Sequence, residues 1–281
     1  MPLSSTFFAA LLALAAAVTW GAGDFAGGLA ARRTGAFRSV LIAYSVGLIA
    51  MAIVALVSGE KLPPLADLGW GALAGLAGMV GVGCLYRGFA SGRMGIVAPV
   101  SAVLATALPV IFSALVKGLP GDSQLAGFGL ALVGIWLLSR PERLGRRPEG
   151  LGMAILAGLG FGAFFIALDQ VSKSAVFWPV VAARLSACVA MIIFALVTRR
   201  PVRLNQLPLK ILTVAGVLDV SGNLFFLLAV QNGRLDIAAV LGSLYPAVTA
   251  FLAWLMIKEH MTRLQVIGVG AAVLAIVLIT V

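Results

Sequence analysis

Residues 117–129 read KGLPGDSQLAGFG, and residues 258–270 read KEHMTRLQVIGVG. The second stretch begins 141 residues after the first (258 − 117 = 141), and both start with Lys and end in the pattern Gly-x-Gly. This offset aligns further residues of the two halves, namely Gly21 with Gly162, Gly75 with Gly216, Gly92-Arg93 with Gly233-Arg234, Ile96 with Ile237, and Gln124 with Gln265. The chain is therefore predicted to consist of two related units, residues 1–140 and 141–281, and such duplication is typical of secondary transporters.

The composition places both units in a membrane. Of 281 residues, 62% are hydrophobic and 11% are charged, and the mean hydropathy is +1.11. Soluble domains carry roughly 25% charged residues. The net charge of +10 does not indicate nucleic-acid binding, because the basic residues lie in short connections between apolar runs and are expected to contact anionic lipid headgroups.

Ten apolar runs have about the length needed to cross a bilayer core. The first run follows no basic segment and is interpreted as a span, not as a cleavable signal. The predicted spans are Phe7–Ala30, Phe37–Val57, Leu68–Ala90, Gly95–Val116, Gln124–Ser139, Leu151–Asp169, Phe177–Val197, Leu209–Gln231, Asp236–Ile257 and Arg263–Val281. The fold class is thus an all-α integral membrane protein with ten transmembrane helices.

The distribution of basic residues predicts an orientation. Fifteen of the twenty Lys and Arg residues belong to the odd-numbered connections, and only Lys61, Lys117, Lys173 and Arg234 belong to the opposite side. The positive-inside rule makes the odd connections cytoplasmic, with both termini extracytoplasmic, in the cell inner (plasma) membrane. Because five crossings reverse direction, the second five-helix unit must be inverted relative to the first.

Charged residues inside the spans need an explanation, because each costs roughly 2.5–3.5 kcal/mol at the bilayer centre. Asp219 lies in the middle of the eighth span, with Asn223 one helical turn further on the same face. This face is a candidate lining of a central site, in which Asp219 binds a cation or proton and Asn223 binds solute. A carboxyl group that only holds helices together is the alternative.

Three further charged residues are candidates for gating or coupling. Asp24 and Arg87 are predicted at similar depth near the cytoplasmic end, either as a structural ion pair or as an inner gate. Arg184 and Asp219 differ in predicted depth, and their side chains should lean apart. Arg184 is therefore expected to extend toward the outer mouth without contacting Asp219, or else to bind an anionic group of the solute.

Polar side chains on other spans complete the predicted solute site. They are Trp20, Tyr86, Ser101, Ser243 and Tyr245. Anchoring at the membrane interface and ordinary packing are the alternatives for the aromatic members. Glycine pairs at small-xxx-small spacing, among them Gly71 with Gly75, are expected to mark close helix packing.

Several classes of activity find no support in the residues. His260 is the single histidine and lies in a connection, so no histidine-based metal site or catalytic triad can be assembled. No Walker motif is present. We therefore expect no enzymatic activity, no metal and no cofactor.

Trp20-Gly21, Pro246, Lys258-Glu259, Gln265 and Gly268 resemble the EamA-like repeat of the drug/metabolite transporter superfamily. The resemblance covers both halves and implies an inverted-repeat transporter with a cavity between spans one, three, four, six, eight and nine. It also implies transport of small metabolites such as amino acids, often outward. The first half departs from the pattern, with Gly118 at the position of Glu259, and the second half carries Phe161 at the position of Trp20.

Together these features predict a secondary transporter that moves a small organic metabolite by alternating access, as an exporter or exchanger. Its expected partners are the solute, the lipid bilayer and, as a candidate coupling ion, the proton. It is expected to be a monomer or a weak homodimer. A lipid flippase and a non-transporting membrane scaffold are the alternatives.

Overall fold

The computed structural model describes residues 5–90, 94–139, 151–199, 207–258 and 262–280, and these are helical apart from short connections. The first half holds α1 (Ser5–Thr34), α2 (Ala36–Ser58), α3 (Leu65–Ala90), α4 (Met94–Lys117) and α5 (Asp122–Ser139). The second half holds α6 (Leu151–Asp169), α7 (Phe177–Val197), α8 (Leu209–Asn232), α9 (Leu235–Gly242), α10 (Tyr245–Ile257) and α11 (Arg263–Thr280). No strand occurs in these ranges.

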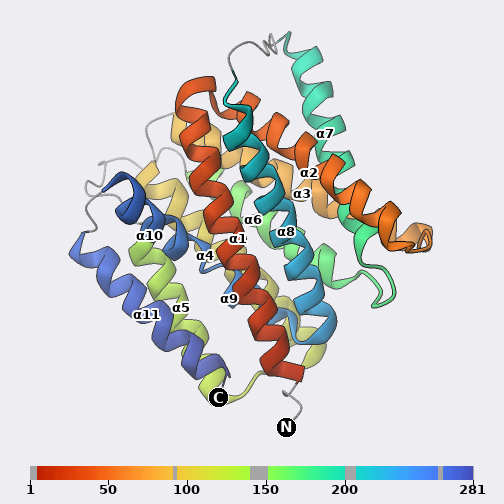
Figure 1. Ribbon diagram of the computed structural model, residues 1–281. Coiled ribbons are helices and arrows are strands. Elements are labelled where there is room, and N and C mark those ends of the chain that lie inside the picture. Colours follow the sequence, from red (N-terminus) through yellow and green to blue (C-terminus); the bar gives the residue numbers. More distant parts are fainter. Residues whose placement is uncertain (1–4, 91–93, 140–150, 200–206, 259–261, 281) are drawn as a thin grey trace.

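The helices follow the predicted spans closely. Within the described ranges, nine helical segments are long and apolar enough to cross a bilayer, and the shorter apolar helix Asp122–Leu138 corresponds to the fifth predicted span. The helix α1 begins, and α11 ends, at the same end of the elongated molecule, which we call the terminal end (Figure 1). The all-helical membrane class is therefore confirmed.

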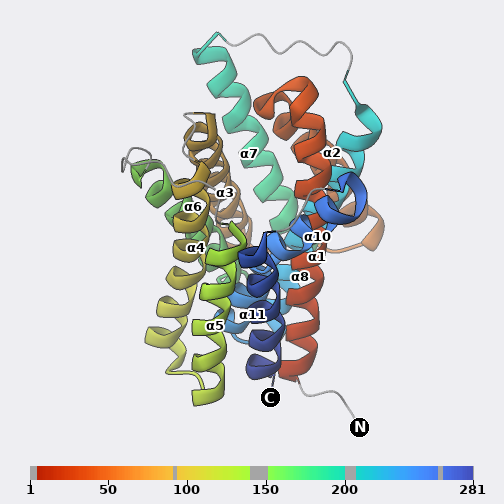
Figure 2. The same cartoon turned by 90° about the vertical axis from the view of Figure 1, so that its left-hand side faces the viewer.

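The helix contacts of one half recur in the other. The helix α1 packs on α8, and its repeat counterpart α6 packs on α3, the counterpart of α8. Likewise α2 packs on α8, and α7 packs on α3. The counterparts α5 and α11 lie side by side in both views (Figures 1 and 2). This layout fits two related five-span units.

Close packing at repeat-equivalent glycines explains two of these contacts. A Cβ atom on Gly75 of α3 would overlap with the carbonyl oxygen of Ala183 on α7. A Cβ atom on Gly216 of α8 would overlap with the carbonyl oxygen of Ala43 on α2 in the same way. Small residues thus let these helix backbones touch, as the small-xxx-small spacing of Gly71 and Gly75 predicted for α3.

The ninth span differs from the expected continuous helix. It is broken after Gly242, and α10 starts at Tyr245 with Pro246 in its first turn. Since proline has no N–H to donate, the helix ladder cannot continue through this position. The break is closed by turn hydrogen bonds, in which the Ser243 N–H donates to Ala239 and the Leu244 N–H donates to Leu241.

The two parts of this span lie in different environments. All eight residues of α9 are buried, whereas no residue of α10 is buried. The helix α9 follows the end of α8 and lies nearer the terminal end, and α10 lies nearer the opposite end (Figure 1). The bundle is therefore more tightly packed around this span at its terminal end.

Candidate functional site

An ion pair between Arg184 and Asp219 lies inside the second half. The Arg184 Nη2 atom is 2.5 Å from Asp219 Oδ2, and the guanidinium stacks on the Tyr44 ring at 4.4 Å from the ring centroid. The Arg184 side chain is 4% exposed, and that of Asp219 is 27% exposed. A charge taken this far out of water requires such a partner. The expectation that Arg184 and Asp219 would not meet was therefore wrong.

The packing of α2 accounts for this contact. The predicted depths were measured from the outer ends of the seventh and eighth spans, which were taken as straight antiparallel helices. In the structure α2 packs on both α7 and α8. The aromatic ring of Tyr44 on α2 supports the guanidinium, and the long arginine side chain spans the remaining gap to Asp219.

Asp24 lies beside this ion pair on α1. The neighbouring residue Gly23 packs against the backbone N atom of Asp219, where a Cβ atom would lie at 3.3 Å. The Asp24 carboxyl group also interacts electrostatically with Asp219 and with the Tyr44 and Tyr245 hydroxyls. Three predicted site residues, Asp24, Asp219 and Tyr245, thus lie in one region together with Tyr44.

The partner predicted for Asp24 falls outside the description. The side chains of Tyr86 and Arg87 belong to the residues whose placement the structure does not describe. The helix α3, which carries both, is not among the main packing partners of α1, namely α8, α10, α9 and α2. Within the described residues the Asp24 carboxylate has no ion pair or hydrogen bond, so the predicted pair with Arg87 stays a prediction.

A second layer of the site is aromatic. The Trp20 indole N–H donates to Asn223 Oδ1 at 3.0 Å, and both side chains are buried. Phe164, Phe165 and Phe226 surround the indole, with ring centroids 5.7–6.2 Å from it. Trp20 and Asn223 each lie one helical turn nearer the terminal end than Asp24 and Asp219. This aromatic layer, composed of these five residues, therefore lies on the terminal side of the acidic groups.

The aromatic layer was not recognised as a unit from the sequence. Phenylalanine is common on every span, so Phe164, Phe165 and Phe226 carry no local signal. A useful signal was present at Phe161 and Phe165, the repeat counterparts of Trp20 and Asp24 (20 + 141 and 24 + 141). Because both counterparts are phenylalanines, the acid of α1 has no equivalent on α6. The polar groups of the site therefore lie on the α1 and α8 side of the bundle.

The two predicted serines are buried in different places, one on α4 and one at the break in the ninth span. Ser243 lies at the break itself, and its Oγ atom has no hydrogen-bond partner among the described residues. Ser101 is buried on α4, which packs on α9. Tyr245 begins α10 and is partly buried, and one turn later Thr249 donates to the Gly21 carbonyl at 3.0 Å. The break therefore brings polar groups close to α1.

One face of α1 changes from buried to exposed along its length. Ala13, Ala17, Trp20, Asp24 and Gly28 follow each other at three- and four-residue intervals and share a face. The first three are buried, whereas Asp24 and Gly28 are exposed. This face is therefore closely packed as far as Trp20 and less covered beyond it, toward the end opposite the termini.

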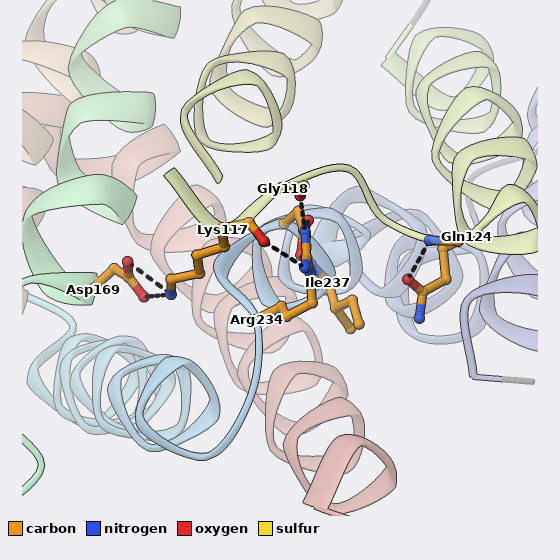
Figure 3. A network of polar contacts seen from close by, with 8 residues as sticks. Lys117, Gly118, Gln124, Asp169, Arg234 and Ile237 are labelled. Atoms are coloured by element: carbon orange, nitrogen blue, oxygen red, sulfur yellow. Dashed lines mark hydrogen bonds and ion pairs between the residues drawn. The ribbon is translucent and has the colours of Figure 1, made fainter. Parts of the chain in front are cut away.

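A polar network closes the terminal end (Figure 3). Lys117 Nζ binds both carboxylate oxygens of Asp169, at 2.9 and 3.1 Å. Arg234 binds the buried Asp236 carboxylate and donates to the Gly118 carbonyl at 2.7 Å. Hydrogen bonding to Asp236 raises the pKa of Arg234 further above its ordinary value, so this cation is permanent. The network links α4 with α6 and with the connection between α8 and α9.

Two acids of the first half hold the connection between α6 and α7 at this end. The Glu60 carboxylate accepts from the backbone N–H groups of Val176 and Phe177, at 2.6 and 2.7 Å, where α7 begins. Asp67 accepts from the N–H and hydroxyl of Ser172, both at 2.8 Å. Carboxylates at a helix N-terminus are stabilised by its unpaired N–H groups. These contacts fix one half against the other.

In the described part of the chain, no three His, Cys, Asp or Glu side chains lie close enough together to hold a metal ion. Among the described residues, the site combines the paired acid Asp219, the acid Asp24 without a partner in these ranges, two phenol groups and the aromatic layer.

Comparisons with known proteins agree with this architecture. A crystal structure of another protein superposes with a TM-score of 0.75, covering 96% of this chain and 95% of that one at 19% identity, which shows the fold alone. An uncharacterised protein of Methanocaldococcus jannaschii is 28% identical over 131 residues, which make up 94% of that protein and 47% of this chain. The model of the EamA-like transporter family matches twice, over residues 7–140 and 148–281. Because these two matches cover nearly the whole sequence, the chain belongs to the EamA-like transporter family.

Proposed function

We propose that this protein is a secondary transporter that moves a small organic metabolite across the inner (plasma) membrane by alternating access, as an exporter or exchanger. The observation that carries the proposal is the face of α1, which is buried at Trp20 and exposed at Asp24 and Gly28. In each of its two states, a carrier must open its binding group to one side of the membrane and close it from the other. Asp24, which is less covered toward one end, and the aromatic layer, which is packed toward the other, fit one such state.

The two units, 1–140 and 141–281, are proposed to be inverted repeats. The exchange of helix partners between halves supports a two-fold relation. With the positive-inside orientation, the terminal end is extracytoplasmic and the accessible end is cytoplasmic. On this orientation, we propose that the conformation of the structure is the one open to the cytoplasm.

Asp24 is proposed as the group that meets the cationic part of the solute or a coupling proton. Asp219 is already compensated by Arg184, whereas Asp24 has no partner among the described residues. An amino-acid-like solute would place its ammonium group at Asp24 and its polar groups near Tyr44 and Tyr245. The tyrosine hydroxyls can both donate and accept hydrogen bonds, which suits such groups.

The aromatic layer is proposed to seal the site from the outside. One buried hydrogen bond joins Trp20 to Asn223. When the transporter opens to the outside, this bond must break, or α1 and α8 must move as one unit. Ser243 lies at the break between α9 and α10, and Ser101 is buried on α4, and both are proposed to line the solute path. Tyr86 remains a proposed solute-site residue, and Arg87 remains a proposed residue of the cytoplasmic gate.

A ligand screen followed by transport tests the proposal. Amino acids, nucleosides, sugars and organic cations are tested for an increase in the melting temperature of the purified protein, because a ligand of the folded state stabilises it. Hits are then measured for counterflow into proteoliposomes. Asp24→Asn should abolish counterflow, whereas Asp122→Asn, which changes an exposed acid at the start of α5, should retain it.

Counterflow that survives Asp24→Asn unchanged would remove Asp24 from the mechanism. Absence of counterflow for every stabilising compound, in the unaltered protein, would contradict transport itself.

A further inference from the structure

The ion pair between Lys117 and Asp169 joins the two halves at the terminal end. Lys117 is the last residue of α4, and Asp169 is the last residue of α6. The Asp169 side chain is only 5% exposed, while that of Lys117 is 35% exposed. A partly buried pair with both carboxylate oxygens engaged is more than a chance surface contact.

A second contact runs beside it. Figure 3 shows Arg234 reaching from the α8–α9 connection to the backbone of Lys117 and Gly118, where α4 ends. Gly118 has φ of +81°, a conformation that glycine adopts without strain, and this turn presents its carbonyl to the guanidinium. Asp236 holds Arg234 in place and accepts from the N–H of Ile237. We call the Lys117–Asp169 and Arg234–Gly118 contacts the outer latch.

The repeat relation shows where an equivalent inner latch would lie. At the offset of 141 residues, Lys117 corresponds to Lys258 and Arg234 to Arg93, so both cations are kept. Their acids are not kept, because Asp169 corresponds to Gly28 (169 − 141) and Asp236 to Gly95 (236 − 141). Glu259, which corresponds to Gly118, lies outside the described residues.

The structure shows the consequence at Gly28. Gly28 is exposed, and a Cβ atom built on it would meet no atom within 4 Å. Its counterpart Asp169 is buried in an ion pair. Lys258, the counterpart of Lys117, is exposed. Among the described residues, Asp169 is thus covered and paired at the terminal end, whereas Gly28 and Lys258 are exposed at the opposite end.

From this we infer that glycine at position 28, where the second repeat has Asp169, makes the latch one-sided, so that without solute the carrier rests closed to the outside and open to the cytoplasm. The inference rests on the proposed function. An ion pair that forms in the outward-closed state and is absent from the outward-open state changes the free-energy difference between the two states by the whole free energy of the pair. The cytoplasmic side is thereby the side from which solute is first bound.

Restoring the missing acid tests this directly. Gly28→Asp should allow a pair with Lys258 when the inner end closes, as Asp169 pairs with Lys117 at the outer end. The matched control is Gly28→Asn, which adds nearly the same bulk without charge. Lys258→Gln in the Gly28→Asp background removes the partner and should reverse the effect.

The readout is the accessibility of a reporter thiol on the wholly buried helix α9. In a background with Cys84→Ser and Cys188→Ala, Ala239→Cys is labelled in lipid nanodiscs with a hydrophilic thiol reagent, in the absence of solute. Gly28→Asp should label about fivefold faster than Gly28→Asn, as expected for one ion pair of moderate strength. Asp169→Asn and Lys117→Gln should each increase the rate similarly by weakening the outer latch.

Equal labelling rates for Gly28→Asp and Gly28→Asn would overturn the inference, and so would an increase that persists with Lys258→Gln. Asp169→Asn changes a covered side chain and could impair folding. Lys117→Gln breaks the same ion pair at its more exposed partner, so it tests the latch even if Asp169→Asn does not fold. Since labelling requires no solute, these results are independent of counterflow. A labelling shift without counterflow would refute the transport proposal, and counterflow without a shift would refute the latch.

Discussion

The guanidinium of Arg184 on α7 lies 2.5 Å from the carboxylate of Asp219 on α8, and the ring of Tyr44 on α2 supports it from one side. Three helices thus share one buried charge arrangement. The two partners are unequally buried, since Asp219 keeps 27% of its side chain exposed and Arg184 only 4%. Because Arg184 is the more deeply buried partner, the loss of stability should depend on which of the two charges is removed.

Asp219→Asn should destabilise the protein more than Arg184→Met. The first change leaves a buried guanidinium without its counter-ion, which costs about 3–5 kcal/mol. The second leaves a carboxylate that water can reach or that can take up a proton. The melting temperature of each variant in detergent provides the measurement, and the double variant should recover part of the loss. A larger loss for Arg184→Met than for Asp219→Asn would contradict the assigned burial.

Asp24→Asn should leave stability nearly unchanged while it removes solute binding. The Asp24 side chain is exposed and has no ion pair or hydrogen bond among the described residues, so the fold does not depend on its charge. The variant is compared with the unaltered protein by melting temperature without ligand and by the ligand-induced shift. Loss of folding in Asp24→Asn would show that the carboxylate has a structural partner instead.

Trp20→Phe should cost about 1–3 kcal/mol and loosen the aromatic layer. The change removes the donor to the buried Asn223 Oδ1 atom, which is then left without its partner. Phenylalanine also keeps an aromatic ring among Phe164, Phe165 and Phe226, so most of the apolar packing is retained. Removing the amide as well, with Asn223→Leu, should recover stability. A thermal unfolding cycle of the four proteins measures the coupling, and additive losses would argue against it.

Gly75→Ala should destabilise the protein by about 1–3 kcal/mol, the usual cost of overpacking. A Cβ atom there would overlap with the Ala183 carbonyl of α7. Gly83 on the same helix is the matched control, because a Cβ atom at that position meets nothing within 4 Å. Gly83→Ala is therefore expected to be neutral or slightly stabilising. Equal melting temperatures for the two variants would disprove the close approach of α3 and α7.

The helices and the small-residue contacts could be predicted because they depend on neighbouring residues. Apolar length sets a span, and the glycine positions that permit close packing, such as Gly75 and Gly216, are visible as a repeated spacing. The Arg184–Asp219 contact was missed because it depends on how α2 separates and supports α7 and α8. The break at Ser243 was missed because a proline within a span can either bend a helix or divide it.

The sequence by itself determined the membrane class, the family and the duplication, because hydropathy and repeat register are properties of the chain alone. Only the tertiary structure decided which charges meet, as with Arg184 and Asp219, and which face of α1 is accessible at Asp24. It also decided that the acids at 169 and 236 close one end while glycines stand at the equivalent positions of the other. The physical reason is that burial and ion pairing depend on the relative depth and tilt of helices, and these are set by packing across the whole bundle.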